Sequence, residues 1–188
     1  MLLSNLVAPM ALAATVLADG AAINAALKTV DGSINSLTAT LNSFSGDIFG
    51  AIPVLFSGIS LKSNIDKGTK VANASQPLTS DDSLSLADTV NTIIADASKS
   101  IDAFIAVKPK FDKLLIVTPI ASGQIKGLRT STVALGKAII AKVPADFTDV
   151  ATQLVSQILA QFDRGVAAYG GTTAAPAFRR STRLERFL

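Results

Sequence analysis

The chain has 188 residues, with 17 Lys and Arg against 14 Asp and Glu, a mean hydropathy of +0.46, and neither Cys nor His. Without thiolate or imidazole the usual nucleophiles, general bases and metal ligands are missing, so we expect no enzyme, no metal site and no cofactor. Four Arg and one Glu in the last ten residues supply the excess charge, which leaves 13 basic and 13 acidic residues elsewhere. That balance argues against a nucleic-acid-binding protein, which requires a basic face.

Residues 1–18 form an uncharged, apolar leader in which Val16 and Ala18 are small residues at the −3 and −1 positions of a cleavage site. This pattern is typical of a secretory signal peptide, so we expect export and a mature chain that starts near Asp19. A buried first helix is the alternative. As a membrane anchor the leader is marginal, since a helix needs about 17 to 25 residues to cross a bilayer. No later segment is expected to span a membrane.

A long amphipathic helix is predicted over about residues 19–44. Its apolar residues follow one another at steps of three and four, which places them on one helix face. These residues are Ile23, Leu27, Val30, Ile34, Leu37, Leu41 and Phe44. Ser45 and Gly46 mark its end. A second helix follows, and Pro53 is predicted to bend or break it because proline removes a backbone hydrogen bond.

Three further helices are predicted after the second. The third begins at the capping side chains of residues 80–82 and ends before Pro109, and the fourth is closed by Pro144. The fifth starts at Asp146, its predicted N-cap, and stops at Gly170. No segment alternates with the period of two that marks a strand.

We therefore predict an all-α fold, an antiparallel bundle of about five long amphipathic helices, because long helices joined by short linkers pack side by side. The bundle domain is expected over residues 19–171. Residues 172–188 are expected to form a disordered basic tail, since they follow a Gly-Gly stop and lack periodicity.

The sequence contains no motif that cradles phosphate or activates a serine. The Asp pairs at 81–82 and 146–149 stand where helix starts need negative charge, which favours capping over acid–base chemistry. One modification motif is present, Asn73-Ala74-Ser75, an acceptor for N-glycosylation in an exported protein. We expect Asn73 to be exposed near the loop at Pro77.

Several short motifs, in this order, make the chain resemble a known family. They are Phe44-Ser45-Gly46-Asp47, Leu78-Thr79-Ser80-Asp81-Asp82, Val107-Lys108-Pro109-Lys110-Phe111, Ala141-Lys142-Val143-Pro144 and Gly165-Val166-Ala167-Ala168-Tyr169. With the first helix they resemble the fungal hydrophobic surface-binding protein A family, which includes the cell-wall galactomannoproteins, over about residues 19–170. The resemblance implies a secreted or wall-associated five-helix bundle without catalytic residues, which binds hydrophobic surfaces or holds a fatty acid between its helices. Because a Ser/Thr-rich stalk and an apolar carboxy-terminal anchor signal are not seen, a soluble secreted form is expected.

Two functions stay open at this point. The high apolar fraction and the amphipathic stripes favour a non-catalytic protein that binds lipids, fatty acids or hydrophobic surfaces. The alternative is a structural cell-wall or interaction protein, such as a recruiter of a secreted hydrolase, without a ligand pocket. If a pocket exists, residues at the stripe centres are expected to line it, with Phe56 and Phe104 as end-caps. The expected lining residues are Leu27, Ile34, Phe56, Ile93, Phe104, Leu128, Leu135, Leu154 and Ile158.

Overall fold

The computed structural model describes residues 13–172, with side chains from residue 19 onward. The expected signal peptide (1–18) and tail (172–188) therefore lie largely outside the described residues. The helices in chain order are α1 (Ala13–Asn42), α2 (Ile48–Ala74), α3 (Ser80–Asp112), α4 (Val117–Ile140), the short 3-10 helix η1 (Ala145–Phe147) and α5 (Thr148–Ala168). No strand occurs over residues 13–172, and the predicted all-α bundle is confirmed.

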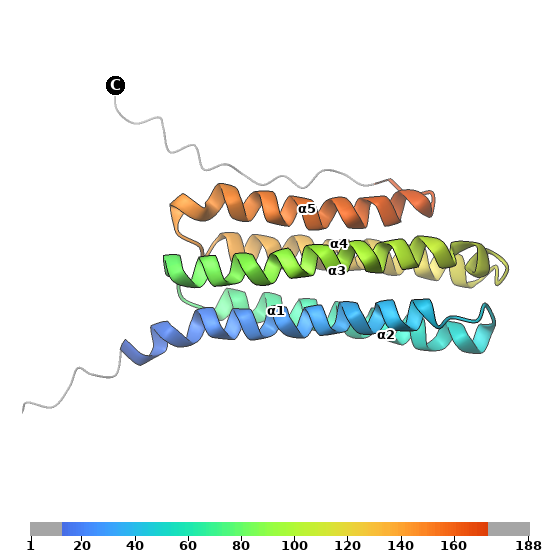
Figure 1. Ribbon diagram of the computed structural model, residues 1–188, viewed down its shortest axis with the longest axis horizontal. Coiled ribbons are helices and arrows are strands. Elements are labelled where there is room, and N and C mark those ends of the chain that lie inside the picture. The colour runs from blue at the N-terminus through green and yellow to red at the C-terminus, as the bar shows by residue number, and fades with distance from the viewer. Residues whose placement is uncertain (1–12, 173–188) are drawn as a thin grey trace, which may run out of the picture.

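The five long helices lie along one axis, and consecutive helices run in opposite directions (Figure 1). Helix α1 packs against α2 and α3, α2 packs against α4, and α5 packs against both α3 and α4. These pairs close a ring in the order α1, α2, α4, α5, α3, across which α3 and α4 touch only lightly. A ring of five helices leaves more room on its axis than a bundle of four, so the arrangement itself favours a central cavity.

The apolar stripe predicted for the first helix is the inner face of α1. All seven of its members, from Ile23 to Phe44, are between 1% and 7% exposed. Aromatic side chains close the end of the bundle where α1 and α3 stop: the ring centroids of Phe111 lie 4.9 Å from Phe44 and 6.3 Å from Phe104. Tyr169 seals the same end, because its hydroxyl donates a 3.0 Å hydrogen bond to the carbonyl of Phe104.

Two helix starts differ from the prediction. The N-cap of α3 is Thr79, whose hydroxyl accepts from the Asp82 backbone N–H at 3.1 Å while the Asp82 carboxylate accepts from the Thr79 N–H. Asp146 does not cap α5, since it lies within η1 and α5 begins after Phe147 without a side-chain cap. The short 3-10 helix η1 stands where the sequence predicted the start of α5 with Asp146 as its N-cap.

Two prolines that were predicted to bend, break or end a helix lie inside helices. Pro53 lies inside α2 and Pro109 inside α3, and neither ends its helix. Each proline is exposed, so its ring lies on the solvent side of the helix, where a bend and a missing backbone hydrogen bond disturb the core least.

No membrane span is expected from the sequence after the leader, but helix α2 meets the length and composition of one. By length and composition alone it is apolar enough to cross a bilayer, and only 28% of its most apolar window is buried in the bundle. Its inner face, with Val54, Leu61 and Ile65, packs into the core. Its outer face therefore exposes apolar side chains that the fold does not cover.

Candidate ligand cavity

The larger cavity of the described bundle lies on the axis of the helix ring. Its volume is about 90 Å³, and its wall takes residues from all five helices and from η1. Along α3 the lining runs from Ser83 to Ala97, which corresponds to about 21 Å at the rise of an α-helix. The shape is therefore long and narrow, as an extended acyl chain requires.

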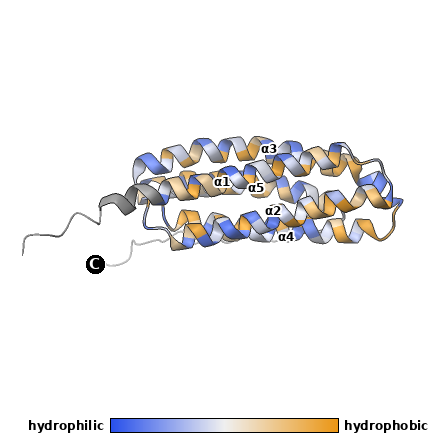
Figure 2. Cartoon of the chain, turned by 90° about the horizontal axis from the view of Figure 1, so that it is seen from below, coloured by the Kyte–Doolittle hydropathy of each residue, from blue (hydrophilic) through white to orange (hydrophobic). Residues whose placement is uncertain are grey.

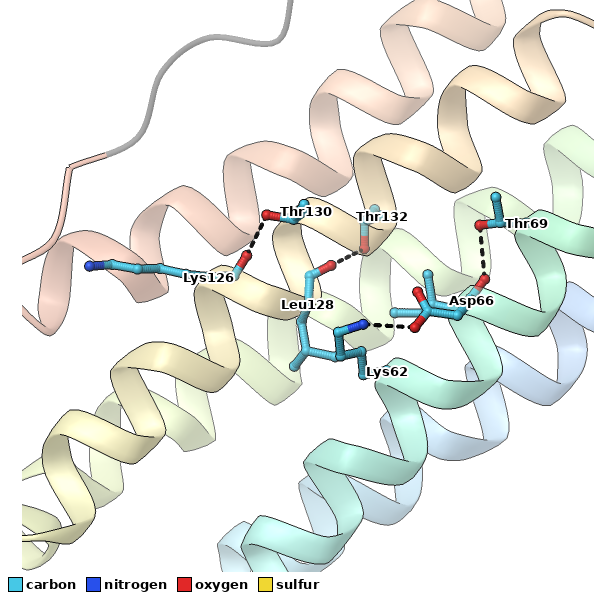
Figure 3. A network of polar contacts seen from close by, with 8 residues as sticks. Lys62, Asp66, Thr69, Lys126, Leu128, Thr130 and Thr132 are labelled. Atoms are coloured by element: carbon cyan, nitrogen blue, oxygen red, sulfur yellow. Dashed lines mark hydrogen bonds and ion pairs between the residues drawn. The ribbon is translucent and has the colours of Figure 1, made fainter.

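The wall of this cavity is almost wholly apolar. Its two hydroxyl side chains are Ser83 and Thr132, and no charged residue lines it. Ser83 donates to the Thr79 carbonyl at 2.8 Å, and Thr132 donates to the Leu128 carbonyl at 2.9 Å (Figure 3). Both hydroxyl protons are donated to nearby backbone carbonyls, so these side chains present no free hydrogen-bond donor to a ligand.

The least buried part of the cavity wall lies on α3, on the start of α5 and on the chain that joins α4 to α5. The partly buried lining residues are Ala87 and Val90 on α3, Val143 and Phe147 before α5, and Ala151 and Leu154 on α5, while Val150 is exposed. A ligand can therefore enter with its apolar end first and leave a polar head at the surface.

A smaller cavity of about 30 Å³ continues along the axis toward Phe104. The two cavities share four lining residues, Ile34, Leu61, Ala97 and Phe162. Phe162 is the largest of the four, and we infer that its ring separates the two spaces.

Eight of the nine residues expected to line a pocket do line a cavity. The larger cavity has Leu27, Ile34, Ile93, Leu135, Leu154 and Ile158, and the smaller one has Ile34, Phe104 and Leu128. The expectation for Phe56 is wrong: it is 67% exposed on the outer face of α2 and lines neither cavity. Residues 48–61 are apolar on every side of the helix, so the sequence does not mark which face is inward.

Sequence reasoning missed Phe162 as a cavity residue. It belongs to the same three- and four-residue stripe as Ile158, but the stripe alone gives no reason to prefer it over its neighbours. Its size and its position four residues after Ile158 are the only sequence signals that set it apart.

The ionisable groups with shifted pKa values lie outside both cavity walls. Burial, and then the nearby Asp96, raise the pKa of Asp31, whose Oδ1 is buried without a hydrogen-bond partner in the described part of the chain. Hydrogen bonds from Lys99 and Asn35 lower the pKa of Asp96. Over residues 13–172 no three metal-binding side chains come together. The site therefore suits apolar binding rather than acid–base or metal chemistry.

Asn73 lies in the last turn of α2, four residues before Pro77, and its predicted exposure is confirmed. Ser75 of the same motif is the buried C-cap, and its hydroxyl donates to the Val71 carbonyl at 2.9 Å.

A five-helix ring around an apolar, uncharged cavity is typical of small all-α proteins that bind lipids or other apolar ligands. The sequence model of the hydrophobic surface binding protein A family matches residues 20–141, so the chain belongs to this family. It is 28% identical over 147 residues to Cell wall mannoprotein 1 of Aspergillus fumigatus, covering 76% of this chain and 49% of that protein. The chain thus spans about half the length of this curated relative.

Two solved structures share the fold. The structure named AFMP4P in complex with palmitic acid has a TM-score of 0.76 and 29% identity, and covers 80% of this chain and 99% of its own. Ligand binding domain 1 of the Penicillium marneffei MP1 protein, complexed with arachidonic acids, also has a TM-score of 0.76, at 17% identity, with 80% and 98% covered. The second likeness concerns the fold alone.

Proposed function

We propose that this protein binds a long-chain fatty acid, or a similar single-chain lipid, in the larger cavity, with the acyl chain along the ring axis and the head group at the least buried part of the wall, between α3 and α5. The observation that carries the proposal is the long cavity, whose wall has no charge and no free hydroxyl proton. The palmitic acid complex of a structure 29% identical supports the same class of ligand. The alternative function, a structural or interaction protein without a ligand pocket, does not account for this cavity.

Burial of the acyl chain is sufficient for useful affinity. A cavity of about 90 Å³ is smaller than a palmitoyl chain, so the helices must move apart to bury all of it. At about 0.8 kcal/mol per methylene, fourteen methylenes buried in this way contribute roughly 11 kcal/mol before the cost of moving the helices. After a cost of at least about 4 kcal/mol for association, roughly 7 kcal/mol is left, which corresponds to a Kd on the order of 10 μM. No cationic anchor is required, in keeping with the uncharged wall.

The protein acts without catalysis in this proposal, because the cavity wall offers no general base that could activate the hydroxyls of Ser83 and Thr132. The name of its mannoprotein relative supports an exported protein associated with the cell wall. Exposed Asn73 is then available to carry sugar.

Replacement of two alanines of α5 by tryptophan, one inside the cavity and one outside it, tests the site. Ala151 lines the cavity at the least buried part of its wall, whereas Ala160, nine residues on, is exposed on the opposite face of α5. Ala151→Trp is expected to fill the cavity there and weaken palmitate binding by at least tenfold in isothermal titration of delipidated protein. Ala160→Trp, which adds the same side chain outside, is expected to leave the Kd within twofold.

Equal affinity of the two variants, or a lack of saturable palmitate binding by the parent protein, would contradict the proposal. Far-UV circular dichroism of both variants checks that the helices are intact.

A further inference from the structure

Most of the exposed large apolar side chains lie at the end of the bundle where α2 and α4 begin, on the face formed by these two helices. Ten large hydrophobic residues are exposed in the described part of the chain, and eight of them lie at the starts of α2 and α4. Phe49 is 78% exposed and leads the α2 group. The five residues from α2 are Ile48, Phe49, Ile52, Phe56 and Ile59.

The α4 side supplies Leu115, Ile116 and Ile120. Leu115 is 83% exposed and has a φ of 41°, a left-handed conformation that is unusual for leucine. Helices α2 and α4 pack together, and the Gln124 side-chain amide donates a 3.0 Å hydrogen bond to the Leu55 carbonyl, which places the two groups side by side. These eight residues form what we call the apolar patch, and the ribbon is strongly orange at this end of α2 and α4 (Figure 2).

The same two helices carry most of the positive charge. Helices α2 and α4 have six basic residues against one acidic residue, Asp66, a net charge of +5. Helices α1, α3 and α5 have five basic residues against ten acidic residues, a net charge of −5. Arg129 of α4 pairs with Asp163 of α5, so it does not contribute a free charge to the outer face. The side of the bundle formed by α2 and α4 is nevertheless the more basic side, and it also bears the apolar patch.

The lysines extend the outward line of the apolar patch along α2. Lys67 and Lys70 follow Phe56 by eleven and fourteen residues, spacings that return to the same helix face, and both are exposed. Lys62 pairs with Asp66 at 2.7 Å, and the Lys126 side chain extends from α4 toward Gly171, just past the end of α5 (Figure 3).

We propose that the α2/α4 face docks on an anionic lipid bilayer, with the apolar patch inserted between head groups and the lysines beside lipid phosphates. Apolar side chains next to a cluster of lysines are the combination that lies in the interface of a negatively charged membrane. A second copy of the chain fits this face poorly, since two faces with an excess of lysine repel each other. The docking does not depend on the cavity, whose least buried wall lies on α3 and α5 and stays accessible.

Vesicle co-sedimentation of the full chain tests the docking. Binding is expected to vesicles of seven parts phosphatidylcholine to three parts phosphatidylglycerol, to be at least tenfold weaker to pure phosphatidylcholine, and to fall as salt is raised. Phe56→Ser is expected to weaken binding at least tenfold, and Lys67→Gln about fivefold. The matched controls are Leu84→Ser on α3, where the leucine is 56% exposed, and Lys28→Gln on α1, which are each expected to change binding less than twofold.

Equal binding to neutral and anionic vesicles, or an unchanged affinity of Phe56→Ser, would overturn the proposal. So would a dimer in sedimentation equilibrium that Phe56→Ser dissociates, because the apolar patch would then be an interface between copies. Palmitate titration of Phe56→Ser separates this proposal from the cavity: the Kd for palmitate is expected to be unchanged while vesicle binding is lost.

Discussion

Phe162→Ala is expected to join the two cavities and lengthen the space open to a ligand. The Phe162 side chain lines both cavities, and they share only three other residues. Along α3 the larger cavity reaches from Ser83 to Ala97, and with the smaller one it reaches Phe104. The axial length then grows from about 21 Å to about 32 Å.

This change has a defined signature in a series of saturated fatty acids from decanoic to docosanoic acid. While each added methylene is buried, it improves Kd by a factor of about four, from 0.8 kcal/mol per methylene. The parent protein is expected to follow that slope and then reach a plateau once the chain fills the larger cavity. In Phe162→Ala the plateau is expected to move to longer acids.

Isothermal titration of delipidated protein measures the series, and Phe111→Ala is the matched control. Phe111 is fully buried in the aromatic end of the bundle and lines neither cavity. Both substitutions are expected to cost about 3 to 5 kcal/mol of stability, but only Phe162→Ala moves the plateau. A plateau at the same chain length in all three proteins would refute the reasoning.

Three stability predictions follow from single contacts. Thr79→Ala removes the side-chain cap of α3 and is expected to lower the unfolding free energy by about 1 kcal/mol; an unchanged denaturant midpoint would contradict this role. Tyr169→Phe removes the hydrogen bond to Phe104 and is expected to cost about 1 kcal/mol, and a variant as stable as the parent would show that the bond contributes nothing. Asp31→Asn is expected to raise the melting temperature at neutral pH. The pKa of Asp31 is raised in the folded state, so its protonated form favours folding below its unfolded pKa and this benefit is lost as pH rises through the folded pKa; a gain of equal size in acid would argue against that cause.

The sequence was sufficient for the fold wherever apolar residues kept strict helical spacing. The stripe from Ile23 to Phe44 identified both the helix and its buried face, because polar residues occupy the remaining positions. It failed where apolar residues surround the helix: residues 48–61 contain no charge, so Phe56 was expected inside although it faces outward. Pro109 misled for a different reason, since its exposed position tolerates a missing hydrogen bond that a buried one would not.

The sequence predicted which residues face the bundle axis, but not which of the two cavities each of them lines. Stripe centres such as Leu135 and Ile158 must face the axis in any bundle, which explains why they line the larger cavity. The division of the axis at Phe162 depends on which helices are neighbours in the ring, and Leu128 fell in the smaller cavity for that reason. Helical periodicity gives the inward direction of a residue but not its height relative to residues of other helices.

The most direct test of an internal lipid site is an isotope-filtered nuclear Overhauser measurement on the delipidated protein with carbon-labelled palmitate. The account predicts contacts from the acyl methylenes to the side-chain methyl groups of Leu86, Leu135 and Ile158, which lie on three different helices around the larger cavity. Contacts confined to exposed residues such as Ile59 and Ile120 on the outer face, with none to these three, would contradict it.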